Sequence, residues 1–365
     1  MLTLHPLFTM PLPRHPFFAL LLCVLPSTFA DARRLLASHS PPSDDSAFWT
    51  RQLGTSYPST SDATSSNREL KRSDKQHPLR RNNVNLFLQE STNGACTPSQ
   101  SNTATPVLLL HGLTYSTHEF DVQYSDYSLV NRLLHECKTV WSLDIAGYGR
   151  SAPVSDGFQP DTNYAADDIN AAVQYITSLS DQRNEIDLLG WSWGTNTATR
   201  YIENYPENHS VRRVVLYAPL INAFDGNPDE LDAFHSNNWD HAASDFQVDN
   251  DGNVDFTIAE PPAVHEFLSN CWRYDQNSSP NGGRRDLLAG SGVQLFDPSQ
   301  IDVPVLMIGG SEDPLLYWDL LEEGFDQLPQ KEESKMLILE GASHILMLEK
   351  DYHKEFQDAV VEFLR

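Results

Sequence analysis

The sequence predicts an α/β fold, in which a doubly wound, mostly parallel β-sheet carries an inserted cap. From about residue 82 to residue 365, short apolar runs alternate with runs of helical periodicity. Such alternation is typical of a parallel sheet covered by helices. It breaks once, at about residues 221–298, over a stretch too long for a simple loop. We therefore expect one domain over residues 82–365 with a cap insertion at about 221–298.

The amino-acid composition limits which classes of molecule the protein is expected to bind. The chain has 365 residues, a formal net charge of -25 and 40% hydrophobic residues, enough for a substantial core. The negative charge argues against binding to nucleic acid or anionic membranes. After the N-terminal region we expect no integral membrane segment. Nothing in the sequence fixes the oligomeric state.

The first thirty residues predict a signal peptide. Arg14 precedes a solid apolar block, Phe17–Leu25, that is too short to span a bilayer. Thr28 and Ala30 place small residues at a cleavage site after Ala30. A mitochondrial presequence would carry several arginines instead. The expected location of the mature chain is therefore extracellular.

Residues 31–81 differ in character from the rest of the chain. They are rich in Ser, Thr, Pro, Asp and Arg, with little periodicity, and such a composition buries too little apolar surface to fold. Dibasic pairs stand at Lys71-Arg72 and Arg80-Arg81. The segment is either a disordered linker or a pro-segment that is trimmed at one of these pairs.

Seven apolar runs predict the strands of the sheet. The first follows Asn82 and alternates, whereas the others are nearly continuous, as expected for strands buried on both faces. Helices are predicted between them, each with an apolar face. The strands are expected at residues 84–88, 106–110, 140–144, 186–189, 211–220, 303–309 and 335–339.

The expected cap follows the strand at 211–220. An insertion there would overhang the carboxyl ends of the strands, where open α/β sheets bind ligands. The stretch contains Trp239 and Trp272 and a marked excess of acidic residues. The alternative is a partly disordered acidic insertion with no role.

One pentapeptide organises the predicted chemistry: Gly190-Trp191-Ser192-Trp193-Gly194. A strand precedes it, and a helical run with Ala198 and Ile202 on one face follows it. Strand, G-x-S-x-G and helix in this order indicate a nucleophile elbow. The turn is sharp enough to require glycine on both sides of the serine. It places the Ser192 hydroxyl at a helix N-terminus, where developing negative charge is favoured.

With these motifs, residues 82–365 resemble the α/β-hydrolase superfamily of serine hydrolases. The resemblance rests on four ordered signals: His111-Gly112, Asp144 with the turn Gly147-Tyr148-Gly149-Arg150-Ser151, the Ser192 elbow, and acid and histidine loops after the last two strands. One departure is Ala146, where members of the superfamily often carry Arg.

The resemblance implies a catalytic triad in the chain order Ser, acid, His. Asp313 follows the strand at 303–309, and His344 follows the strand at 335–339. We expect Ser192 as nucleophile, Asp313 as acid and His344 as base. Asp225, past the preceding strand, is the rival acid.

An oxyanion hole is also implied, formed by the backbone amides of Trp193 and Leu113, with Thr114 as a less favoured donor. The aromatic residues Trp191, Trp193, Phe120 and Tyr124 either line an acyl pocket or pack in the core.

The function that follows is a secreted serine hydrolase acting on a small-molecule carboxylic ester through an acyl-enzyme, with lipase-like or lactonase activity included. Two alternatives stay open. One is an aminopeptidase resembling proline iminopeptidases, whose acidic cap would pair with a substrate ammonium. The other is a non-catalytic secreted effector. No cofactor fingerprint and no metal-ligand cluster appears in the sequence, and Asn208 and Asn277 begin glycosylation sequons.

The resemblance also bears on the cysteines. It places the strand at 84–88 antiparallel beside the strand at 140–144, so that Cys96 and Cys137 lie at the same sheet edge, away from the catalytic loops. A secretory route would allow a disulfide between them. The alternative is that Cys96, Cys137 and Cys271 are all free thiols.

Overall fold

The computed structural model describes residues 70–365 except 180–183, 250 and 276–277. The predicted signal peptide (residues 1–30) and residues 31–69 lie outside the described residues. Eight strands form one sheet in the order β1-β2-β4-β3-β5-β6-β9-β10. Their bounds are β1 Arg72–Arg81, β2 Val84–Asn93, β3 Val107–Leu110, β4 Val140–Asp144, β5 Ile186–Trp191, β6 Val211–Tyr217, β9 Val305–Gly310 and β10 Lys335–Leu339.

The sheet is doubly wound and mostly parallel, as the sequence predicted. β1 and β2 run antiparallel to their neighbours, and the other six strands, β4, β3, β5, β6, β9 and β10, run parallel. Every residue of β3, β4, β5 and β9 is buried, because helices cover both faces and leave no room for polar alternation. The central strands therefore end in loops that all meet at one edge.

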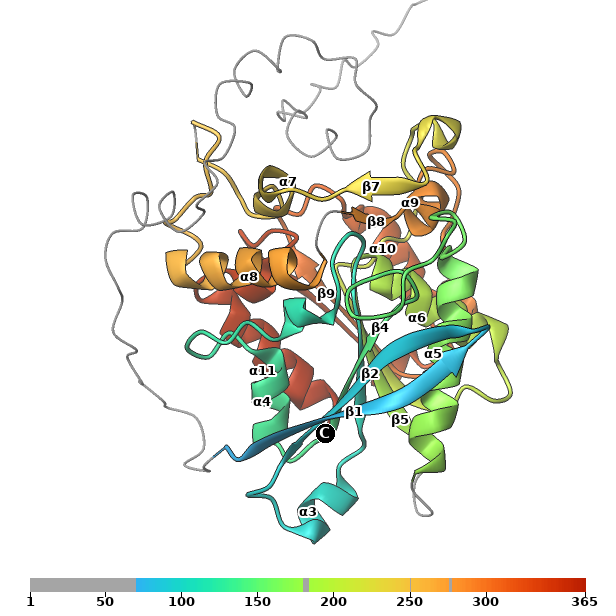
Figure 1. The fold of residues 1–365 in the computed structure, drawn as a ribbon, viewed down its shortest axis with the longest axis vertical. Helices are drawn as coiled ribbons and strands as arrows, with labels where there is room; N and C mark the ends of the chain where they lie inside the picture. The colour runs from blue at the N-terminus through green and yellow to red at the C-terminus, as the bar shows by residue number, and fades with distance from the viewer. Residues whose placement is uncertain (1–69, 180–183, 250, 276–277) are drawn as a thin grey trace, which may run out of the picture.

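Helices flank the sheet on both sides (Figure 1). α4 (Leu129–His135) and α11 (Tyr352–Phe363) lie together on one face, and α5 (Thr162–Ser178) and α6 (Trp193–Asn204) on the other. Among the described residues, no helix combines the length and the apolarity needed to cross a membrane. The remaining helices outside the cap region are α3 (Pro98–Thr103), α10 (Trp318–Asp326) and the 3-10 turns η2 (Thr117–Phe120), η4 (Pro298–Gln300), η5 (Lys331–Glu333) and η6 (Leu346–Leu348).

The predicted start of the folded domain at residue 82 is wrong, because β1 lies before it. β1 pairs with β2 along its whole length. Asn82 and Asn83 link the two strands with φ angles of 46° and 66°, the left-handed pair that a two-residue hairpin turn requires. Arg81, half of one predicted cleavage pair, donates to Asp168 at 2.5 Å. The prediction failed because β1 is an edge strand with mostly exposed polar side chains, so it has no apolar signature.

Residues between β6 and η4 form a separate layer over the carboxyl ends of the strands (Figure 1). Tyr148, in the loop after β4, donates to the Pro280 carbonyl at 2.9 Å. Arg284 donates to Thr114, in the loop after β3, at 2.8 Å. This layer contains η3 (Pro228–Glu230), β7 (Phe234–Ser236), α7 (Trp239–Ala243), α8 (Pro261–Tyr274), β8 (Ser278–Pro280) and α9 (Gly282–Leu287), and we refer to it as the cap.

A disulfide joins Cys96 and Cys137, whose Cα atoms are 5.8 Å apart. It lies at the amino end of β4, opposite the cap. Of the described cysteines, Cys271 is free and buried. The disulfide prediction is thus confirmed, because the antiparallel pairing of β2 with β4 brings the end of one strand beside the start of the other.

Candidate active site

Ser192 occupies the turn between β5 and α6 with φ 55° and ψ -121°, a region that few non-glycine residues adopt. Gly190 and Gly194 permit this turn. A Cβ atom on Gly190 would lie 2.2 Å from the Gly194 carbonyl oxygen, and one on Gly194 would lie 2.4 Å from the Leu110 carbonyl oxygen of β3. Ser192 itself stays partly exposed while its neighbours are buried. The local backbone therefore presents the hydroxyl at the carboxyl edge of the sheet.

His344 and Asp313 form a buried pair at this edge. The distance from His344 Nδ1 to Asp313 Oδ2 is 2.7 Å, and both residues are less than a tenth exposed. Because a carboxylate only accepts, Nδ1 carries the proton, and neutral His344 keeps its lone pair on Nε2. The Glu312 amide donates to the Ala342 carbonyl at 2.9 Å, so the backbone holds the two loops together.

The carbonyl of His344 is fixed from the elbow side. Trp191 Nε1 and the Tyr217 hydroxyl donate to it at 3.0 Å and 2.8 Å. Trp191 immediately precedes Ser192, and its ring centroid is 5.4 Å from that of His344. The strand that ends in the serine therefore also positions the loop that carries the histidine. The sequence left Trp191 open between an acyl pocket and core packing, and this hydrogen bond to the loop of His344 was not predicted.

Electrostatics favour the charged form of His344. Burial by itself would lower the pKa of His344, but the charge and hydrogen bond of Asp313, with a contribution from the charge of Asp245, outweigh burial and raise that pKa. Burial raises the pKa of the cap residue Asp245 to about 7. An imidazolium formed during a reaction would thus be stabilised at this position.

The rival acid Asp225 is not at this position. It is exposed, and its carboxylate accepts from the Ser291 amide at 2.9 Å. Glu312, beside Asp313, is also exposed. The structure therefore brings Asp313 to His344 and leaves Asp225 in the cap surface.

The predicted oxyanion donors belong to two segments that meet beside Ser192. A Cβ atom built on Gly112, which precedes Leu113, would lie 3.4 Å from Ser192 Cβ. Trp193 is the first residue of α6, so its amide has no acceptor within that helix. Thr114 has a φ of 80°. The geometry places the loop after β3 against the elbow, as an oxyanion hole requires.

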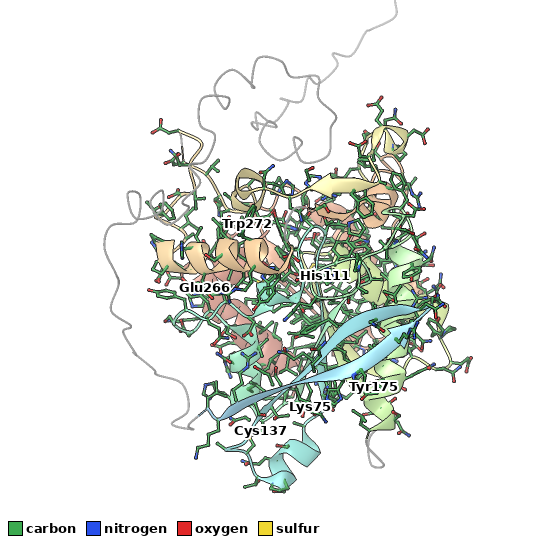
Figure 2. The ribbon with its side chains drawn as sticks, in the orientation of Figure 1. Lys75, His111, Cys137, Tyr175, Glu266 and Trp272 are labelled. Atoms are coloured by element: carbon green, nitrogen blue, oxygen red, sulfur yellow. A yellow bond between two sulfur atoms is a disulfide. The ribbon has the colours of Figure 1, made fainter. Side chains whose placement is uncertain are left out.

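Two buried side chains that the sequence analysis did not assign hold this loop. Glu119 Oε1 accepts from the Gly112 amide at 2.9 Å. His111 Nε2 accepts from the Ile145 amide at 3.0 Å, while Nδ1 donates to the Gly112 carbonyl at 2.7 Å. Figure 2 shows His111 in the middle of the molecule, below the cap. The His-Gly pair was visible in the sequence, but Glu119 carried no signal because its partner is a backbone amide.

The remaining motif residues are structural. The fully buried Asp144 carboxylate accepts from the amides of Thr117 and Arg150 at 3.1 and 3.0 Å and from Arg150 Nε at 2.9 Å. Burial would raise its pKa, but Arg150 holds the pKa of Asp144 below its ordinary value. At the departure from the family pattern, the Ala146 amide donates to Asp168 at 3.0 Å. This turn therefore orders the loop without touching Ser192.

The four aromatic residues are mainly packing groups. Trp193 and Phe120 are almost fully buried, and Trp193 Nε1 donates to Thr162 Oγ1 at 3.0 Å. Trp191 stacks on Tyr217 with centroids 5.7 Å apart. Tyr124 is partly buried and stacks on Tyr127. Core packing, the alternative left open by the sequence, accounts for Trp193 and Phe120.

A family model described as the alpha/beta hydrolase fold matches residues 105–351. The match spans more than half of the chain and includes Ser192, Asp313 and His344. The protein belongs to the alpha/beta hydrolase family. A comparison with the curated proteins found no match.

Solved structures with the same fold include two esterases. An esterase from Rhodococcus sp. is 18% identical with a TM-score of 0.54, and one from Thermogutta terrifontis is 16% identical with a TM-score of 0.55; each comparison covers 80% of this chain and 98% of the other. A 2-hydroxy-6-oxo-6-phenylhexa-2,4-dienoate hydrolase from Rhodococcus sp. is 16% identical, with a TM-score of 0.54 and coverage of 81% and 100%. At these identities the likeness concerns the fold.

Proposed function

We propose that this protein is a secreted serine hydrolase that cleaves carboxylic esters through an acyl-enzyme. The observation that carries the proposal is the buried His344–Asp313 pair, 2.7 Å apart, at the sheet edge where Ser192 occupies its strained turn. A serine hydroxyl is a weak nucleophile near neutral pH and needs an oriented base beside it. This edge supplies the serine, a base with a defined tautomer and the acid that fixes it.

In the proposed first half-reaction, His344 Nε2 takes the hydroxyl proton while Ser192 Oγ attacks the ester carbonyl carbon. The resulting imidazolium is stabilised by Asp313. It then protonates the departing alcohol, leaving Ser192 acylated. In the second half, His344 deprotonates a water that attacks the acyl carbon, and the carboxylic acid leaves with Ser192 restored.

The amides of Leu113 and Trp193 would donate to the oxyanion of each tetrahedral intermediate. Both belong to segments held rigidly beside Ser192: Glu119 and His111 fix Gly112, and α6 begins at Trp193. Fixed donors stabilise developing charge without reorganisation during the reaction. The proposal of an ester substrate, rather than another acyl compound, draws on the serine chemistry and on the names of the esterases that share the fold.

An aminopeptidase is the second candidate, because Asp245 of the cap lies close enough to His344 for the charge of each to affect the other. A carboxylate in that position would attract a substrate ammonium. The pKa of about 7 leaves only part of the Asp245 population charged at neutral pH, which weakens this attraction. Esters therefore remain the favoured class.

The test combines a fluorophosphonate probe with two substrate panels, p-nitrophenyl esters and aminoacyl anilides. We expect labelling of Ser192 and faster turnover of the esters. Faster turnover of the anilides would replace the ester proposal with the aminopeptidase. An absence of labelling in the folded protein would point to the non-catalytic alternative.

Secretion is proposed from residues 1–30 and is supported by the Cys96–Cys137 disulfide, since such bonds persist in oxidising compartments. Intact mass of the secreted protein should show that residues 1–30 are absent. Glycan at Asn208, which is exposed, is expected from a eukaryotic host; Asn277 lies outside the described residues. Secreted protein that retains Met1 would contradict the signal peptide.

A further inference from the structure

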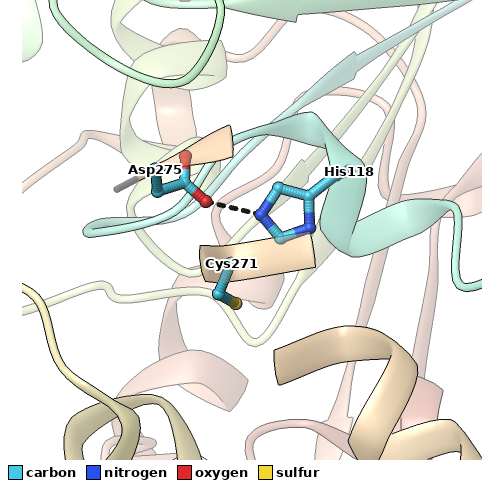
Figure 3. A group of neighbouring side chains, drawn as sticks. All are labelled: His118, Cys271 and Asp275. Carbon is cyan, nitrogen blue, oxygen red and sulfur yellow. Dashed lines mark hydrogen bonds and ion pairs between the residues drawn. The ribbon is translucent and has the colours of Figure 1, made fainter. Parts of the chain in front are cut away.

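Three side chains with metal-binding atoms gather between the cap and the loop region after β3. They are His118 of η2 and the α8 residues Cys271 and Asp275, where Asp275 caps the helix end. One ligand atom from each lies within 4.8 Å of the other two. Figure 3 shows His118 and Asp275 facing each other, with Cys271 next to them.

All three residues are withdrawn from solvent. His118, Cys271 and Asp275 are 4%, 5% and 6% exposed. Cys271 and Asp275 are four residues apart and therefore share one face of α8. His118 approaches from a segment more than 150 residues earlier in the chain, which is why no ligand spacing appears in the sequence.

Some polar side-chain atoms of this cluster have no hydrogen-bond partner among the described residues. His118 Nε2 pairs with Asp275 Oδ2 at 2.5 Å. The other atoms of the two groups, His118 Nδ1 and Asp275 Oδ1, are buried and have no hydrogen-bond partner among the described residues. Buried polar atoms of this kind nearly always have a partner. Both residues also offer a ligand atom within 4.8 Å of the Cys271 sulfur.

We propose that His118, Cys271 and Asp275 form a binding site for a divalent transition-metal ion, with Zn²⁺ as the favoured occupant. A thiolate, an imidazole and a carboxylate are a normal donor set for zinc, whereas magnesium and calcium prefer oxygen donors alone. Three protein ligands leave the fourth tetrahedral position for water. One thiolate and one carboxylate would balance the charge of the ion.

The geometry requires only local adjustment. Ligand atoms around tetrahedral zinc lie about 3.5 Å apart, so the widest separation of 4.8 Å must shorten by roughly 1 Å and the His118–Asp275 contact must lengthen. Cys271 would bind the ion as a thiolate, so binding would release the thiol proton to solvent.

A shallow surface depression lined in part by Asn237, Cys271 and Trp272 lies on the cap side of the cluster. Trp272 lies on the cap surface, where Figure 2 labels it. A bound metal would tie α8 to η2, the turn whose Glu119 holds the Gly112 amide, and so couple the cap to the loop beside Ser192.

The test uses the full secreted protein stripped of metal with a chelator and titrated with Co²⁺ and then Zn²⁺. We expect one Co²⁺ per chain, with a thiolate-to-cobalt charge-transfer band in the near ultraviolet that Zn²⁺ abolishes. Zinc at one hundred times its Kd should raise Tm by about 5 °C. Absence of stoichiometric binding, or cobalt binding without the thiolate band, would overturn the proposal.

Variants identify the ligands. Cys271→Ser should remove the charge-transfer band and the rise in Tm, and Asp275→Asn should weaken cobalt binding at least tenfold. His265→Gln, on the same helix but outside the cluster, is the matched control and should bind as the wild type does. A band that survives in Cys271→Ser would disprove the site. If Cys271→Ser does not fold, Asp275→Asn decides, and unchanged cobalt affinity in it contradicts the proposal.

Discussion

Two groups of buried charged residues, one at each edge of the central sheet, differ in how completely they are paired. At the amino edge, the fully buried Asp187 uses both carboxylate oxygens: Arg212 reaches them at 2.8 and 2.7 Å, and Lys138 Nζ lies 3.3 Å from Oδ2. A disulfide lies next to this network. At the carboxyl edge, Glu119, His118 and Asp275 each keep a buried side-chain atom without a partner among the described residues.

This difference corresponds to two roles, a structural role for the amino edge and a chemical role for the carboxyl edge. Charges with every hydrogen bond satisfied make a rigid edge, whereas unsatisfied groups concentrate where a ligand completes them. Ser192, with its unusual backbone angles, lies on the unsatisfied side. Changes at the carboxyl edge should therefore alter activity with little effect on stability, and changes at the amino edge should do the reverse.

The largest effect is expected from Ser192→Ala. Ester turnover should fall by at least about 10⁴-fold, and fluorophosphonate labelling should vanish, because the attacking oxygen is gone. The midpoint of urea unfolding should stay the same, since Ser192 is partly exposed and alanine removes only its hydroxyl oxygen. Turnover that survives in the purified variant would remove Ser192 as the nucleophile.

Next in size is Asp313→Asn, with Asp225→Asn as its matched control. The side-chain amide introduced by Asp313→Asn would favour the wrong His344 tautomer, so kcat should fall by about 10³- to 10⁴-fold. Asp225→Asn should change kcat less than twofold, because Asp225 contacts Ser291 at the surface. The reverse order in steady-state kinetics would show that Asp225 is the acid.

At the amino edge, replacing Cys96 and Cys137 together by Ser should lower the free energy of unfolding. Their sequence separation of 41 predicts a loss of about 4 kcal/mol from loop entropy, with about 2–4 kcal/mol typical. The kcat/KM of the folded variant should stay within twofold of the wild type. A fall in kcat/KM that matches the fall in stability would contradict the claim that the amino edge contributes to stability and not to activity.

The smallest predicted effect is a shift in pH dependence. His344 must be neutral to act as a base, so kcat/KM should fall as pH drops through its raised pKa. Asp245→Asn removes a negative charge that stabilises the imidazolium. The acidic limb of the profile should therefore move to lower pH, by less than about one unit. Asp249→Asn, an exposed acid of the cap region, should leave the limb in place, and an unmoved limb in Asp245→Asn would contradict the assigned coupling.

The sequence patterns correctly predicted those strands of the sheet whose apolar residues are required by burial. β4 and β10 have the predicted bounds, and the other predicted strands differ only at their ends. For the buried strands β3, β4, β5 and β9 the reason is that a strand covered on both faces must be continuously apolar. The residues Asp313 and His344, which the structure pairs, were predicted because each follows a strand at the same edge. The Cys96–Cys137 pairing followed from the strand order that the family resemblance implied.

What the sequence did not reveal depends on contacts between distant segments. β1 was missed because an exposed edge strand needs no apolar pattern, although Asn82-Asn83 was a readable turn signal. Three features arise only when the loops meet: the hydrogen bond from the Gly112 amide to Glu119, the bond from Trp191 to the His344 carbonyl, and the grouping of His118 with Cys271. No local periodicity encodes them.

β1 has a consequence for how the protein behaves in concentrated solution. As the outer strand, it presents Lys75, Pro78 and Arg80 along an edge that resists pairing with another chain (Figure 2 labels Lys75). A protease that cut after Arg81 would sever this strand from the domain, and its dissociation would expose β2, whose Leu86, Phe87 and Leu88 are buried. Maturation at that dibasic pair would thus yield an open, apolar edge prone to aggregation, whereas cleavage upstream of residue 70 would leave the edge protected.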